Sequence, residues 1–115
     1  MTQADFRRLA LSLEGVEERS HMAHPDFRVG GRIFATMGYP KAGWAMVRLT
    51  SADQDAFVQM KSGAFLPVKG KWGEQGCTNV ILSKATVPSV RAALRAAHES
   101  AVKAGRARGR KAGIE

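Results

Sequence analysis

Two adjacent glycines, Gly30 and Gly31, join two short runs rich in β-branched and aromatic residues, 27–29 and 32–37. Glycine adopts the positive φ angles of tight hairpin turns without steric cost, so a two-glycine link between such runs predicts a β-hairpin. A loop rich in glycine and proline then leads to a third strand at 44–49. The first half of the chain is therefore expected to contain a three-stranded antiparallel meander.

Helical patterns lie on both sides of this meander. Thr2 and Asp5 have the spacing of a capping box and precede apolar residues at helical intervals, which predicts a first helix over 2–14. Caps and apolar runs place the other elements: a helix from residue 50 or 51 to about 62, a short edge strand at best over 64–68, a glycine-rich loop over 69–76, a strand over 78–82, and an alanine-rich helix from 88 to about 103.

This order of elements, α-β-β-β-α-(β)-β-α, is typical of the α+β class. At 115 residues the chain suits one domain with a mainly antiparallel sheet. We expect the first and last helices to lie on one face of the sheet and the two glycine-rich loops to project from it. The domain is assigned to residues 1–104. Residues 105–115 are basic and almost free of apolar side chains, so we expect a disordered tail.

The formal net charge of +8 is unevenly placed. Seven basic and two acidic residues from Arg91 onward contribute +5, and residues 1–90 contribute only +3. Cys77 is the only cysteine, which excludes a disulfide scaffold and predicts a buried structural thiol. No apolar run approaches the roughly 20 residues of a membrane span. These features favour a cytoplasmic domain with some affinity for polyanions.

The two basic loops are the first candidate site. Arg28 and Arg32 flank the glycines of the predicted hairpin, and Lys69, Lys71 and Trp72 share the second glycine-rich loop. Cationic side chains on projecting loops bind phosphates, and a tryptophan can stack on a base or wedge between bases. The alternative is that the charges are only solvated and that the tryptophan packs on the sheet edge.

The C-terminal region is the second candidate. Arg91 and Arg95 are one helical turn apart on the last predicted helix, and the tail adds four more basic residues, namely Arg106, Arg108, Arg110 and Lys111. A basic arm raises the affinity for any polyanion in a salt-dependent way. A purely solubilising tail is the alternative.

Metal binding and catalysis find little support in the sequence. His21 and His24 are three residues apart, which on a strand places them on opposite faces, and zinc sites normally need three or four ligands. We therefore expect no metal and no cofactor, and a histidine that hydrogen-bonds the hairpin backbone. Motifs typical of nucleotide or hydrolase sites are absent from the sequence. An unrecognised enzyme would need a cleft that holds His21 or His24 beside a carboxylate.

Several segments resemble the MmcQ/YjbR family of small bacterial proteins over roughly residues 4–100. The run SHMAHPDFRVGGRIFAT at 20–36 is similar to that family, as are Gly43-Trp44 with Val47-Arg48-Leu49, Phe65 with Pro67-Val68, and Trp72-Gly73. The resemblance implies a paired-wing fold, also compared with bacterial frataxin, and a role in DNA binding. It supplies no set of catalytic or binding residues.

The leading hypothesis is a small non-enzymatic protein that contacts the backbone of double-stranded DNA through its basic loops and tail. The alternative is a protein-interaction or small-ligand module that uses the sheet face between the loops, lined by Tyr39, Trp44, Met46 and Phe65. Sequence preference, oligomeric state and biological process are open at this point.

Overall fold

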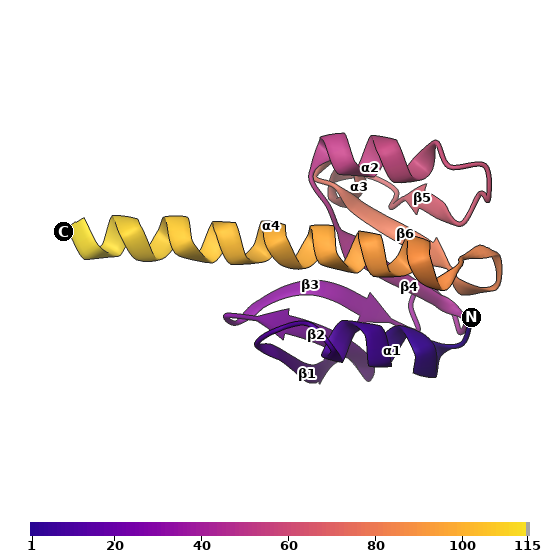
Figure 1. Cartoon of the computed structure of the whole chain (residues 1–115), viewed down its shortest axis with the longest axis horizontal. Helices are drawn as coiled ribbons and strands as arrows, with labels where there is room; N and C mark the ends of the chain where they lie inside the picture. The colour runs from indigo at the N-terminus through magenta and orange to yellow at the C-terminus, as the bar shows by residue number, and fades with distance from the viewer. Residues whose placement is uncertain (115) are drawn as a thin grey trace.

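The computed structural model describes residues 1–114, with side chains as far as Arg106. Six strands form one sheet in the order β1-β2-β3-β4-β6-β5, with antiparallel pairing between all neighbours (Figure 1). The α+β class predicted from the sequence is confirmed. The elements are α1 (Gln3–Leu11), β1 (Val16–His21), β2 (His24–Val29), β3 (Arg32–Met37), β4 (Trp44–Arg48), α2 (Ser51–Val58), β5 (Phe65–Pro67), α3 (Lys71–Glu74), β6 (Cys77–Ile81), a 3-10 turn at Leu82–Lys84 and α4 (Val87–Ile114).

Helices α1, α2 and α4 cover one face of the sheet. Strand register places Phe27 of β2 and Phe65 of β5 on the same face, because both align with alternate residues of β3, β4 and β6. Phe6 of α1 packs edge-on against Phe27 at 6.1 Å between ring centroids. In α2 and α4, Phe57 and His98 pack on Phe65 and Phe34 at 5.1 and 5.6 Å. The predicted location of the first and last helices on one face is confirmed.

The first strand, β1, was not predicted. Five of its six residues are polar, and most of them are exposed, so the segment has no alternating apolar pattern. Its turn to β2 consists of Met22 and Ala23, with φ angles of 51° and 65°. Neither residue is glycine, and the usual sequence signal for such a turn is therefore missing. The predicted hairpin at Gly30 and Gly31 is present, with φ angles of 57° and 79°.

The second glycine-rich segment is more ordered than the predicted loop. Residues 71–74 form the short helix α3, and the amide of Val68 before it donates to the carbonyl of Cys77 at the start of β6, at 3.0 Å. Gln54 of α2 donates from Nε2 to the carbonyl oxygens of Gly73 and Cys77, at 2.9 and 3.1 Å. The buried amide therefore fastens α3 and the start of β6 to α2.

The last helix is longer than expected. α4 runs from Val87 to Ile114, whereas the sequence pattern predicted an end near Lys103. Its first half lies on the sheet, and its second half continues past the end of the sheet beside the β2–β3 turn (Figure 1). The division into a domain ending at residue 104 and a separate tail stays a prediction. Within the described residues, no helix is both long enough and apolar enough to span a membrane.

Candidate nucleic-acid interface

Both predicted basic loops lie at the same end of the sheet. Arg48, the last residue of β4, is paired in register with Cys77, the first residue of β6. The amide of Leu49 donates to the carbonyl of Gly76 at 3.0 Å, which places the segment before β6 beside the end of β4. β3 is antiparallel to β4, so its first residue, Arg32, begins at this same end. The β2–β3 turn and the α3 segment therefore flank the point at which α4 leaves the sheet.

A cavity of about 270 Å³ lies between these segments and α4. Its polar lining consists of two arginines, two hydroxyl side chains and one amide, and the described residues that line it include no carboxylate. The residues are Arg32, Arg48, Thr50, Gln75 and Ser100. Strand alternation carries the Arg48 side chain, like those of Trp44 and Met46, onto the face opposite the helices. The lining residues that keep side-chain donors on the α4 side are therefore Arg32, Thr50, Gln75 and Ser100. Phosphate oxygens accept hydrogen bonds from such donors. The donor set suits an anion.

Arg32 and Arg28, predicted to act together, lie on opposite faces of the hairpin. The register pairs Arg28 with Ile33 and Val29 with Arg32, so the two arginines alternate across the sheet. Arg28 donates from Nε and Nη2 to the carboxylate of Asp26, at 2.8 and 3.1 Å. This ion pair lowers the pKa of Asp26 and raises that of Arg28. Arg28 is therefore already engaged, and Arg32 is the hairpin cation that faces the cavity.

The second predicted group is exposed near this end. Lys69 precedes α3, and Lys71 and Trp72 lie within α3, so the prediction that these last two occupy a loop is wrong in its local structure. The Trp72 side chain is 62 % exposed, which leaves its ring accessible to a partner. The alternative prediction, that this tryptophan packs on the sheet edge, is therefore wrong.

The α4 candidates divide into three groups. Arg91 and Arg95 are exposed in the first half of the helix, on the opposite side of α4 from the residues that line the cavity. Arg106 is exposed and lines a second, larger cavity of about 520 Å³ together with Glu14, Glu99 and Lys103. The side chains of three further candidates lie outside the described residues, namely Arg108, Arg110 and Lys111.

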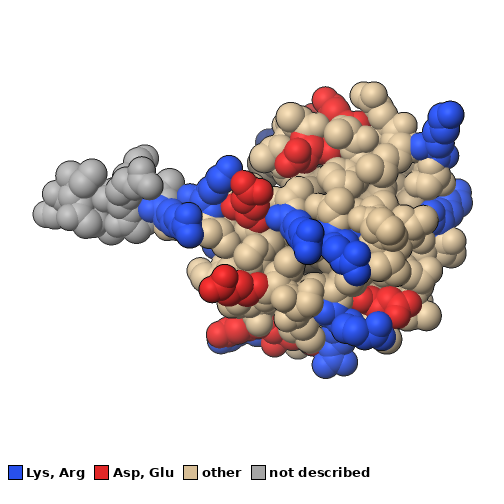
Figure 2. Space-filling model, in the orientation of Figure 1, with Lys and Arg blue, Asp and Glu red and all other residues tan. Residues whose placement is uncertain are grey.

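The helix-covered face has no continuous positive patch. Figure 2 shows basic side chains along α4 and at the lower edge of this face, with acidic side chains between them. Three surface ion pairs contribute to this mixture: Arg7 with Glu18, Arg8 with Asp5 and Lys103 with Glu99. The acid-free cavity at the end of the sheet is therefore a local concentration of donors within a surface of mixed charge.

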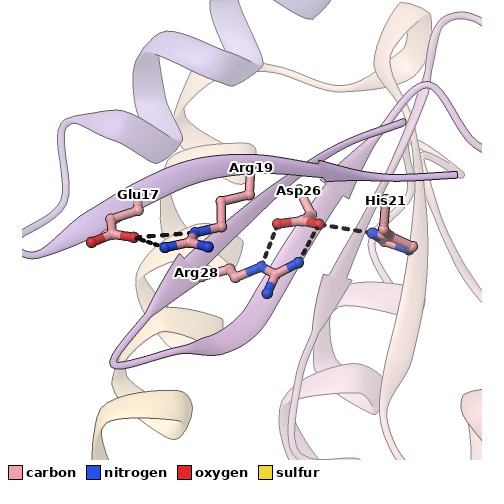
Figure 3. Close-up of polar contacts among 5 residues, drawn as sticks. All are labelled: Glu17, Arg19, His21, Asp26 and Arg28. Atoms are coloured by element: carbon pink, nitrogen blue, oxygen red, sulfur yellow. Dashed lines mark hydrogen bonds and ion pairs between the residues drawn. The ribbon is translucent and has the colours of Figure 1, made fainter. Parts of the chain in front are cut away.

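A buried carboxylate on the other face holds a histidine and an arginine (Figure 3). Asp26 is fully buried, and it contacts Nδ1 of His21 at 2.7 Å as well as the Arg28 guanidinium. We predicted that His21 or His24 hydrogen-bonds the hairpin backbone; for His21 this is wrong, because its ring contacts a side chain. His21 and His24 are also direct partners across the β1–β2 turn rather than residues on opposite faces, since two turn residues separate the strands.

This polar cluster meets only half of the condition set for an enzyme. A histidine does lie beside a carboxylate, but neither of the two cavities beside α4 is lined by Asp26 or His21. No group of three or more histidine, cysteine, aspartate or glutamate side chains is gathered for metal binding within the described residues. The contacts of these side chains form an ion pair that joins β1 to β2.

The sheet face used by the alternative hypothesis is present in part. Trp44 and Met46 are half-buried on the face opposite the helices, and Tyr39 is exposed in the loop before β4. Phe65 is only 1 % exposed and packs on Phe57, so its assignment to this surface is wrong and it belongs to the core. The predicted burial of the cysteine is confirmed, and burial raises the pKa of the Cys77 thiol.

Sequence reasoning missed Arg48 as a member of the site. The residue was placed on a strand, but its neighbourhood depends on the pairing of β4 with β3 and β6, which connects segments about 15 and 30 residues away. Its only local signal is a cation at the end of an apolar strand. Gln75 and Ser100 give no signal at all until α4 is laid against this end of the sheet.

Comparison with known families gives one match. A family model described as YjbR matches residues 11–100, which is most of the chain and includes every strand. No curated protein and no solved structure matches the chain.

Proposed function

The chain belongs to the YjbR family, and from that membership and the charge at one end of its sheet we propose that it is a non-enzymatic, cytoplasmic bacterial protein that binds the backbone of double-stranded DNA. The observation that carries the proposal is the acid-free donor set around the cavity beside α4, which includes Arg32, with Arg48 at the same end of the sheet. Both predicted basic loops lie next to it.

The proposed contacts are mainly with phosphates. Lys69 and Lys71 are exposed in the segment that leads into β6, and Arg106 is exposed in the second half of α4. Phosphate contacts release counterions and position a protein on DNA, but they do not read sequence. Trp72, exposed in α3, is the one aromatic side chain of this set that can stack on or wedge between bases. The proposed binding is therefore largely independent of sequence.

Neutralising Arg32 and Arg48, the two arginines at this end of the sheet, tests the location of the interface. We expect the double variant Arg32→Gln/Arg48→Gln to weaken binding to a fluorescein-labelled duplex by about tenfold or more and to reduce the salt slope by about 2, because two phosphate contacts are lost. The measurement is a fluorescence anisotropy titration at several salt concentrations.

The matched control is Arg91→Gln/Arg95→Gln, which changes the net charge equally on the outer side of α4. This variant is expected to weaken binding less than threefold, by the general loss of charge alone. If both double variants bind duplex DNA equally well, the interface does not lie at this end of the sheet.

The uncovered sheet face supports a second candidate function, that of a protein-interaction module. Trp44 and Met46 are half-buried there, on the face opposite the buried residues Ala45 and Val47. This function predicts that duplex DNA is not bound at low salt, and that substitution of Met46 changes binding to a partner protein while substitution of Arg32 does not.

A further inference from the structure

The cavity beside α4 differs chemically from its counterpart on the other side of the helix. The larger cavity contains the carboxylates of Glu14 and Glu99 together with the cations of Lys103 and Arg106. The smaller one has the cation of Arg32 on the α4 side, and none of the described residues lining it is acidic. Only the smaller cavity offers an anion a lining without charge repulsion.

The size of the smaller cavity also limits what it can hold. Its volume of about 270 Å³ is below the range of roughly 300–1,000 Å³ that encloses drug-sized ligands. The wall that α4 contributes is made of small side chains only, namely Ala97, Ser100, Ala101 and Ala104. The space therefore exists because α4 presents no long side chain to it, and it suits a single phosphate-sized group.

The hydroxyl groups of the lining are available as donors. The Oγ1 atom of Thr50 accepts a hydrogen bond from the amide of Asp53 at 3.1 Å, because Thr50 caps α2, and its own proton is left for another acceptor. Within the described side chains, neither Arg32 nor Arg48 has a carboxylate within ion-pair distance. These donors are not consumed by internal contacts.

We propose that this cavity is a phosphate-binding pocket, which takes one phosphate group held by Arg32 and by the hydroxyls of Thr50 and Ser100. The proposed pocket depends on the proposed function only in naming DNA as the source of the phosphate. A backbone phosphodiester and a free phosphate both present acceptor oxygens to the pocket. In the DNA complex, the pocket fixes the position of one backbone phosphate beside α4.

Filling the cavity tests this assignment without changing any charge. In Ala101→Leu the larger side chain occupies the space, whereas Ala92→Leu makes the same change at an exposed position of α4. Inorganic phosphate is titrated into the full chain and followed by ¹H–¹⁵N NMR, with sodium chloride at matched ionic strength as the reference. We expect saturable shifts at the amides lining the cavity, lost in Ala101→Leu and retained in Ala92→Leu.

Duplex DNA forms the second arm of the experiment. Ala101→Leu is expected to weaken duplex binding about tenfold, as the loss of charge-assisted hydrogen bonds to one phosphate requires. Arg32→Gln, which keeps the volume of the cavity, should reduce both phosphate and duplex binding even if Ala101→Leu does not fold. Phosphate shifts elsewhere on the surface, or equal phosphate binding by the two leucine variants, would overturn the pocket. Phosphate binding without duplex binding would support the pocket and contradict the proposed function.

Discussion

Replacing Gly76 by alanine is expected to destabilise the protein by more than about 4 kcal/mol, one of the largest effects available at a single residue. A Cβ atom built at this position lies 1.8 Å from the carbonyl oxygen of Leu49, and the φ angle of 102° is one that L-residues rarely adopt. Relief of the clash requires β4 and the segment before β6 to separate. Their hydrogen bond from Leu49 to Gly76, 3.0 Å long, would then be lost.

Urea unfolding followed by circular dichroism measures this effect, and two further alanine variants separate its causes. Gly31→Ala has a φ of 79° but no atom within 4 Å of the new Cβ, so it isolates backbone strain and should cost about 1–2 kcal/mol. Gly73→Ala meets the carbonyl oxygen of Val68 at 1.7 Å and should behave like Gly76→Ala. If Gly76→Ala is no less stable than Gly31→Ala, this result would contradict the close approach of β4 to the segment before β6.

Removal of the buried carboxylate is the second large effect. Asp26→Ala is expected to lower the free energy of unfolding by about 3 kcal/mol, because it leaves the Arg28 guanidinium partly buried without its partner. Asp55→Ala, an exposed aspartate on α2, is the matched control and should change stability by less than about 0.5 kcal/mol. Equal stability of the two variants would contradict the structural role of this ion pair.

The contribution of Asp26 also depends on pH. The hydrogen bonds from Arg28 are the largest cause that lowers its pKa below the ordinary value of 3.8. A group with a lowered folded-state pKa stabilises the fold above its unfolded-state pKa, and this stabilisation is lost as pH falls towards the folded-state value. The difference in unfolding free energy between wild type and Asp26→Asn should be constant above about pH 5 and shrink below about pH 4. A difference that grows on acidification would contradict this sign.

The sequence was sufficient for elements with a local signal. The capping box of Thr2 and Asp5 is present in α1, with both reciprocal hydrogen bonds, and the glycine turn joins β2 to β3. β1 was missed because an edge strand of polar residues is held by pairing with β2 rather than by a buried face. Its turn at Met22 and Ala23 uses residues that seldom adopt positive φ angles, so no composition rule could locate it.

The candidate site was predictable only in pieces. Arg32 and the cations near α3 were found from composition and loop signals. The meeting of these segments at one end of the sheet depends on the order β4-β6-β5, in which β6 is inserted between two earlier strands. The engagement of Arg28 by Asp26 depends on side chains that alternate onto the same face two residues apart, a pattern that a hairpin prediction centred on the glycines did not use.

The net charge of the chain also says little about the site, because the charges are unevenly distributed and partly paired. Most of the net +8 belongs to α4 and the residues that follow its contact with the sheet, and several cations of the main body are paired with carboxylates. The cavity lined by Arg32 and Arg48 is distinguished by the absence of acidic side chains from its described lining rather than by the number of its cations. Local composition of a site is therefore more informative here than net charge.

A titration of the full chain into labelled duplex DNA at 50 and 200 mM salt tests the proposed function most directly. If the five cations Arg32, Arg48, Lys69, Lys71 and Arg106 each neutralise one phosphate, the affinity should fall about 500-fold between the two conditions, with a logarithmic slope of about −4.5. Absence of binding at the lower salt concentration, or an affinity that does not change with salt, would contradict the proposal.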